Sequence, residues 1–311
     1  MRPCLPGKSS GRWRTEWCVS VVKSLSSNHA LKPLIPTFCL VVVLIYGLAD
    51  RLRNFVAGIF IPQYHFPYPV ALSFAQVLVS LLFLNLLHAL NLVALKPYSR
   101  SLGERLLLPA ICNSAQAVLT MWAKASSSSA SLFLVTVPLL PLVTLALSFT
   151  LQLRSPPSIH SSVLISILSG MVMVITASKG IQAIEPLEYI YAPLALILHS
   201  ISLIGLTKVS EAERHRHPNT QASAFDIYHT QMVNQSWLLG FLWLLHPDNP
   251  WQVVSQSSWH SLLFHGYLLA IILLGMVLNF MVGMSALCIS PLAAALLYST
   301  RQIVQPLLQL L

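Results

Sequence analysis

Charge is scarce in this chain. Only 9% of its 311 residues are charged, against about 25% in a typical soluble domain, and 55% are hydrophobic. This shortage excludes an ordinary soluble domain and indicates a membrane protein that crosses the bilayer several times. The formal net charge of +9 is not interpreted as a nucleic-acid signal, because its meaning depends on which loops carry it.

Motifs for catalysis and metal binding are lacking as well. The sequence has no G-x-x-x-x-G-K-[ST] loop, no H-E-x-x-H and no G-x-S-x-G, and no paired carboxylates fall inside an apolar stretch. The five cysteines show neither metal-ligand spacing nor a disulfide pattern: Cys4, Cys18, Cys39, Cys112 and Cys288. We therefore expect no metal, no cofactor and no enzymatic activity.

Hydrophobic runs separated by polar breaks predict an all-α polytopic membrane protein. Helices are expected because an isolated strand would leave its backbone donors and acceptors unpaired in lipid. A basic tail, residues 1–33, precedes the first run and has no apolar core followed by a cleavage site, so we expect a cytoplasmic tail, with a transit peptide as the alternative. The nine predicted spans lie at about 37–61, 68–93, 105–123, 131–152, 159–178, 189–207, 225–245, 263–284 and 286–309.

Lysine and arginine are distributed unevenly between the connections. Thirteen of the 18 fall in the N-terminal tail and the even-numbered connections, whereas only Lys124 and Lys179 fall in the odd-numbered ones. Positively charged loops stay on the cytoplasmic side of a membrane. The N-terminus and the even-numbered connections are therefore predicted to be cytoplasmic.

Arg301 is the most unusual residue of the last apolar stretch, 285–311. A charge at that depth costs at least about 2.5–3.5 kcal/mol on insertion scales, so it is expected to face protein or a water-filled cavity. We interpret it as an anchor for an anionic solute. The alternative is that its long stem reaches the headgroups.

Other polar residues interrupt the apolar stretches. Asp50 and Arg53 are three apart in the first stretch and are predicted to form a buried pair; the alternative is that the span ends near Ala49 and that both residues belong to a short amphipathic continuation. Most polar groups in membrane bundles only hold helices together, but several of them near an intramembrane arginine favour a polar cavity. The candidate residues are Arg53, Asn113, Gln116, Tyr228, His229, Gln231, Asn279 and Arg301.

Prolines occur in the fourth stretch, at Pro138 and Pro141, and in the ninth, at Pro291 and Pro306. Helices interrupted at corresponding places in two halves of a chain often mark the binding site of a transporter. A division after the fifth stretch leaves five spans in the first half, and this odd number would make the second half enter the membrane in the opposite orientation. The prolines therefore favour a transporter, and the odd number meets the orientation requirement of an inverted repeat, although the two halves show only weak residue-level similarity.

Three short segments resemble the nucleotide-sugar transporters of the drug/metabolite transporter superfamily, which are related to the triose-phosphate translocators. Residues 64–69 (YHFPYP) resemble the family's Y-G-F-P-x-P before the second helix. Residues 225–229 (FDIYH) resemble its seventh-helix L-x-x-Y-N. Residues 290–302 resemble its ninth-helix N-S-A-L-T…G-x-x-K-N, with Arg301 at the basic position.

The resemblance implies ten helices in two inverted five-helix repeats, here 34–180 and an incomplete 181–311, with nine helices visible and the tenth apparently missing through truncation or alternative splicing; a fold of nine spans is the alternative. It also implies a multi-pass protein of the Golgi or ER membrane that exchanges a nucleotide sugar for a nucleoside monophosphate. The fourth stretch lacks the basic residue that relatives commonly have there. Two alternatives therefore stay open, namely an exporter of another small metabolite and a non-transporting or truncated scaffold; the oligomeric state is also open, with a homodimer as one alternative.

Overall fold

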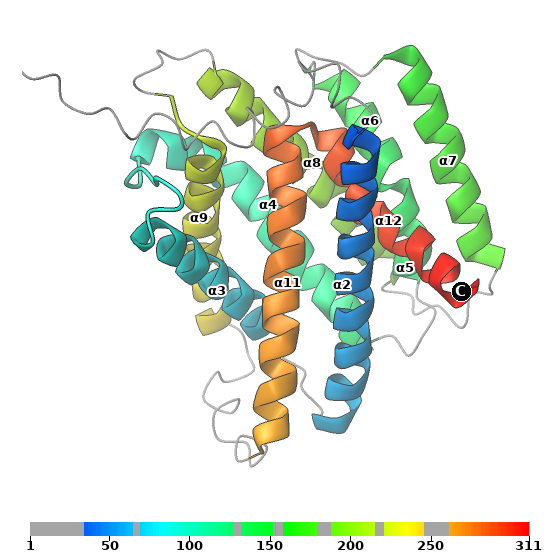
Figure 1. The fold of residues 1–311 in the computed structure, drawn as a ribbon, viewed down its shortest axis with the longest axis horizontal. Coiled ribbons are helices and arrows are strands. Elements are labelled where there is room, and N and C mark those ends of the chain that lie inside the picture. The colour runs from blue at the N-terminus through cyan, green and yellow to red at the C-terminus, as the bar shows by residue number, and fades with distance from the viewer. Residues whose placement is uncertain are drawn as a thin grey trace, which may run out of the picture.

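The computed structural model describes residues 34–64, 69–126, 132–151, 153, 158–178, 188–214, 221–245 and 261–310. All regular secondary structure in these residues is helical, and no strand occurs among them (Figure 1). The predicted all-α class is therefore confirmed. The basic tail, residues 1–33, lies outside the described residues.

The helices coincide with the apolar stretches of the sequence. Their ends differ from prediction by several residues, most clearly in the sixth stretch, where the helix continues to Arg214. The elements are α2 (Leu34–Tyr64), α3 (Pro69–Ala89), α4 (Arg100–Ser126), α5 (Leu132–Thr136), the 3-10 turn η1 (Val137–Leu139), α6 (Leu140–Thr150), α7 (Ile159–Ser178), α8 (Glu188–Arg214), α9 (Ala224–Leu245), α11 (Leu262–Cys288) and α12 (Pro291–Leu310).

Four helices of the described part are long and apolar enough to cross a membrane. They correspond to Val70–Ala89 of α3, the whole of α7, the whole of α8 and the whole of α11. A membrane-crossing helix needs about 20 predominantly apolar residues. The chain therefore fits a multi-pass membrane protein.

The prolines of the two halves act differently. Pro138 lies in the 3-10 turn that separates α5 from α6, so the predicted interruption of the fourth stretch is present. Pro291 is instead the first residue of α12, where a missing N–H costs nothing, and the Ser290 hydroxyl accepts from the Ala293 N–H (3.0 Å). The prediction that Pro291 interrupts a helix is therefore wrong: it begins one.

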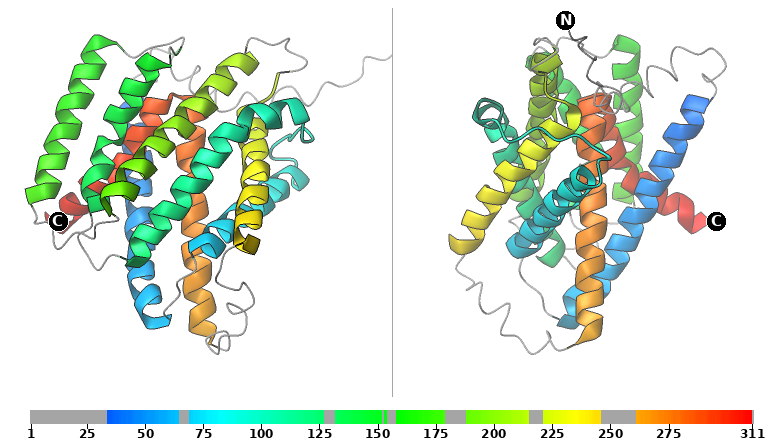
Figure 2. Two further views of the ribbon diagram at one scale, coloured as in Figure 1. Left: turned by 180° about the vertical axis from the view of Figure 1, so that it is seen from behind. Right: turned by 60° about the vertical axis from the view of Figure 1, so that its left-hand side comes forward.

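The most extensive helix–helix contact of the bundle is the seam between α4 and α8. Seen from behind, these two helices lie in front of α11 and α2 (Figure 2). Leu106 of α4 and Leu206 of α8 share one buried apolar cluster with Tyr228 of α9. By contrast, α7 stands at the edge of the bundle, and only 11% of its most apolar window is buried.

Contacts at one end of the bundle bring several polar connections together. Arg105, near the start of α4, donates to Glu213, near the end of α8 (3.3 Å). Arg214 donates to the carbonyl of Leu287 at the end of α11 (3.2 Å), and the Lys96 N–H donates to Asp226 at the start of α9 (2.8 Å). The starts of α4 and α9 and the ends of α8 and α11 therefore meet at the same end of the bundle.

A buried carboxylate ties helices at the opposite end. Glu188, at the start of α8, accepts from the N–H of Leu132 at the start of α5 (3.0 Å) and from the hydroxyl of Tyr191 (3.2 Å). Only 3% of Glu188 is exposed. An acidic side chain at a helix N-terminus satisfies a backbone donor and is favoured by the helix dipole.

Candidate functional site

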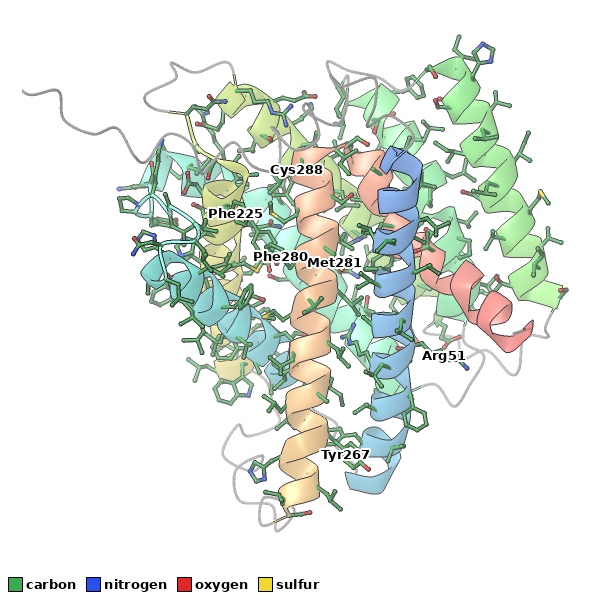
Figure 3. All side chains as sticks on the ribbon, in the orientation of Figure 1. Arg51, Phe225, Tyr267, Phe280, Met281 and Cys288 are labelled. Carbon is green, nitrogen blue, oxygen red and sulfur yellow. The ribbon has the colours of Figure 1, made fainter. Side chains whose placement is uncertain are left out.

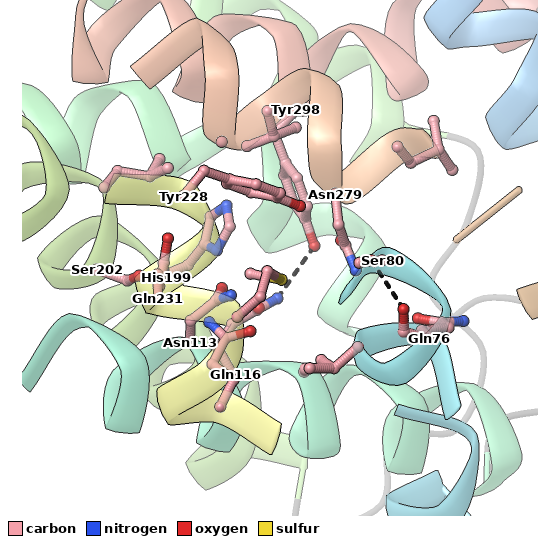
Figure 4. Close-up of a pocket in the computed structure, with 18 of the residues that line it drawn as sticks. Gln76, Ser80, Asn113, Gln116, His199, Ser202, Tyr228, Gln231, Asn279 and Tyr298 are labelled. Atoms are coloured by element: carbon pink, nitrogen blue, oxygen red, sulfur yellow. Dashed lines mark hydrogen bonds between the residues drawn. The ribbon is translucent and has the colours of Figure 1, made fainter. Parts of the chain in front are cut away.

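An interior cavity of about 60 Å³ lies within the seam, surrounded by α2, α3, α4, α8, α9, α11 and α12. It is too small for a drug-sized ligand, whose sites measure about 300–1,000 Å³. Most of its lining residues have polar side chains, several of which are labelled in Figure 4: Arg53, Gln76, Ser80, Asn113, Gln116, Thr120, His199, Ser202, Gln231, Gln235, Asn279 and the tyrosines Tyr46, Tyr228 and Tyr298.

Six of the lining residues carry side-chain amides, and they come from four helices: Gln76, Asn113, Gln116, Gln231, Gln235 and Asn279. Each amide has two donor hydrogens and an acceptor oxygen. Such groups are costly inside an apolar bundle unless they are hydrogen-bonded. Their convergence on one cavity therefore makes a site that can bind hydroxyl groups and heterocycle edges.

Helix α9 presents one continuous polar stripe to the cavity. Tyr228, Gln231 and Gln235 are spaced three and four apart, which places them on one helix face. Gln231 is 1% exposed and Gln235 is 2% exposed. The Gln231 carbonyl oxygen and the Gln235 amide nitrogen have no hydrogen-bond partner within the described residues. One acceptor and one donor on adjacent turns are thus available to a bound molecule or water.

A second group of contacts crosses the cavity between α4, α8 and α12. Gln116 donates to the Thr120 hydroxyl (2.8 Å) and to the Tyr298 hydroxyl (3.3 Å). The Tyr298 ring lies against His199, with the ring centroids 4.5 Å apart. Tyr298 therefore connects the last helix to both sides of the seam.

Arg53 provides the only permanently charged side chain in the described lining. It is 7% exposed, and no carboxylate belongs to the described residues that line the cavity. Asp50 is buried as well and accepts a hydrogen bond from Asn54 one turn later (2.9 Å). The Asp50–Arg53 pair stays a prediction. The two residues differ in their place relative to the cavity, since Arg53 contributes to the lining, whereas Asp50 does not.

Six of the eight predicted site residues line the cavity: Arg53, Asn113, Gln116, Tyr228, Gln231 and Asn279. His229 does not line it, although the preceding residue, Tyr228, does. The Arg301 backbone belongs to α12, three residues after Tyr298, but its side chain lies outside the described residues.

Several lining residues were not predicted. Gln76 and Ser80, one turn apart on α3, and His199 and Ser202 on α8 are isolated polar residues in strongly apolar stretches. That contrast is a signal the sequence contains. Tyr46 and Tyr298 give no such signal, because a tyrosine in an apolar stretch is as easily a core residue.

Arg51 shows the difference between α2's inner and outer faces. It is two residues from Arg53 on the same helix, yet its side chain is exposed on the outside of the bundle (Figure 3). The two arginines form a natural matched pair for mutagenesis.

No protein-family model matches the chain.

Proposed function

We propose that this chain is a multi-pass transporter of polar solutes, and specifically a nucleotide-sugar antiporter that exchanges a nucleotide sugar for a nucleoside monophosphate. One observation carries the proposal: amides, hydroxyls and one guanidinium converge on a cavity inside a bundle of apolar helices, and no carboxylate belongs to its described lining. A lining of this kind suits an anionic solute with many hydroxyl groups.

The buried amides support a ligand site rather than a merely structural network. An unsatisfied buried donor or acceptor costs about 1–3 kcal/mol, and both Gln231 and Gln235 have such an atom. A sugar hydroxyl or a nucleobase edge offers a donor and an acceptor side by side. Binding such a group would remove both costs at once, so we assign the α9 stripe to contacts with the solute.

The phosphates are assigned to the two arginines. A guanidinium binds phosphate oxygens through two parallel hydrogen bonds, and this geometry distinguishes it from a lysine. Arg53 lines the cavity. Tyr298 lines it too, and Arg301 follows Tyr298 by one turn of α12. Arg301 remains the sequence-based candidate for the main phosphate anchor, with Arg53 as the second.

Transport requires the cavity to open, because about 60 Å³ admits only a few water molecules. We propose that residues 34–180 and 181–311 are the two inverted repeats of a ten-helix fold and that they rock against each other along the α4–α8 seam. The Arg105–Glu213 pair would close the cytoplasmic end and the Glu188–Leu132 contact the opposite end. The N-terminus would be cytoplasmic and the membrane that of the Golgi or ER.

The test is exchange uptake into proteoliposomes that hold nucleoside monophosphates, against a panel of labelled nucleotide sugars. We expect one of them to be taken up by the wild type, and its uptake to be lost in Arg301→Ala and strongly reduced in Arg53→Ala. Arg51→Ala is the matched control, since Arg51 is exposed on the outer face of the same helix. Uptake that survives both cavity substitutions contradicts the proposal.

A second candidate is an exporter of another small metabolite. The small volume of the cavity and the dominance of neutral amides over charge favour it. Uptake of a neutral or zwitterionic solute that nucleoside monophosphates do not inhibit would select this candidate. A chain that transports nothing in either assay would instead be a membrane scaffold.

A further inference from the structure

Gly283 of α11 lies directly against the ring of Tyr228 of α9. A Cβ built at Gly283 would be 2.6 Å from Tyr228 Cε2 and 3.0 Å from Cδ2. Separations this short are below van der Waals contact between carbon atoms. An alanine at this position therefore requires the tyrosine ring or the helix to move.

The Tyr228 ring has little room on its other sides. It is 1% exposed, and it packs edge-to-face against Phe280, with the ring centroids 5.4 Å apart. Tyr228 and Gly283 both line the cavity, which is the open space beside the ring. A displaced ring would consequently enter the cavity and occupy part of its volume.

We propose that Gly283 is a specificity-determining residue. Because Gly283 has no side chain, the Tyr228 ring can pack against α11, and the position of this ring sets the width of the solute site. Gly283 contributes no polar side chain to the site and acts through Tyr228. The expected effect on uptake rests on the proposed function. The expected effect on the space inside the bundle does not depend on that function.

The first measurement is KM and maximal rate for exchange by Gly283→Ala. We expect KM for the nucleotide sugar to rise at least about fivefold, with a smaller rise for the more compact nucleoside monophosphate, because overpacking costs of this size are typical of filled interiors. Gly266→Ala is the matched control: it lies on the same helix, and a Cβ there meets nothing within 4 Å. Equal effects on the large and the small substrate, or equal effects of the two alanines, would overturn the proposal.

The second measurement does not depend on transport. A cysteine placed at Asn113, in a chain whose five native cysteines are replaced, reports access to the cavity through its reaction rate with a small thiol reagent. We expect Gly283→Ala to slow the reaction at least about fivefold and Gly266→Ala to leave it unchanged. The double variant Gly283→Ala/Tyr228→Leu, which removes the ring, should restore the rate.

The exchange assay and the cysteine-reaction assay together distinguish failure of the proposed function from failure of the role proposed for Gly283. If the wild type exchanges no nucleotide sugar, the proposed function fails, and the cysteine rates alone decide the role of Gly283. If Gly283→Ala does not fold but the double variant does, the clash with Tyr228 is supported. An unchanged rate in Gly283→Ala, or a double variant that neither folds nor regains the rate, would contradict the claim that Gly283 accommodates the Tyr228 ring.

Discussion

Helices α7 and α8 are almost equally apolar, yet the structure uses them in opposite ways. Both are long enough to cross a membrane. In the most apolar window of α8, 56% of the residues are buried in the bundle, against 11% in that of α7. Overall hydropathy therefore identifies a helix suited to a membrane but says nothing about whether lipid or protein surrounds it.

The polar residues explain the difference. The buried polar groups of α8 include His199 and Ser202 at the cavity and Glu188 and Glu213 near its two ends. The hydroxyls of α7 are largely satisfied within their own helix, as when Ser166 donates to the carbonyl four residues earlier (2.9 Å). A helix that satisfies its own polar groups can face lipid, whereas α8 needs partners on other helices.

The largest expected effect compares leucines of the two helices. Leu203 of α8 is 2% exposed, and Leu164 of α7 is 68% exposed. We expect Leu203→Ala to lower the free energy of unfolding by about 2–5 kcal/mol, because it leaves a cavity in packed protein. Leu164→Ala should change it far less. Thermal unfolding in one detergent measures both, and equal losses would break the contrast between the helices.

A charge on the outer face of α7 tests whether that face meets lipid. Ile167 is 57% exposed and lies near the middle of the helix. Ile167→Asp should weaken insertion by about 2.5–3.5 kcal/mol, since an acidic side chain at the centre of a span has no partner there. A glycosylation reporter fused after α7 measures the inserted fraction. Undiminished insertion of the aspartate variant would show that this face is not in the bilayer core.

The next effect concerns the carboxylate that joins α8 to α5. Glu188→Ala removes the acceptor of the Leu132 N–H, and we expect it to cost about 0.5–2 kcal/mol of stability, the usual value of a helix cap. Glu104, in an exposed pair with Arg100, is the matched control, and Glu104→Ala should cost about 0.5 kcal/mol or less. Thermal unfolding again provides the comparison. A larger loss from Glu104→Ala would contradict the assigned roles.

Much of the fold follows from the sequence, because apolar length and the period of the helix are local properties. The positions of the helices and six of the cavity residues could be predicted in this way. Contacts between helices could not be predicted from these local properties. The sequence places Asp50 and Arg53 on one face, but which of them turns toward the cavity depends on how α2 packs against α11 and α12.

Two further differences have the same physical origin. Pro291 marks a helix start rather than an interruption, because the preceding helix ends at Cys288 and the chain turns there. His229 was predicted to join the site by its place in a sequence pattern, but the face of α9 that meets the cavity is fixed by Tyr228, Gln231 and Gln235. Register within a bundle depends on tertiary packing, which short sequence patterns do not record.

The most direct test of the account compares one cavity position with one position on α7. In a chain without its native cysteines, Gln231→Cys and Leu164→Cys are exposed to a membrane-impermeant thiol reagent in proteoliposomes. We predict that the cysteine at 231 reacts and is protected by the transported nucleotide sugar, whereas the cysteine at 164 stays unreactive in lipid. Reaction at 164 that equals reaction at 231, or reaction at 231 that no nucleotide sugar slows, would contradict it.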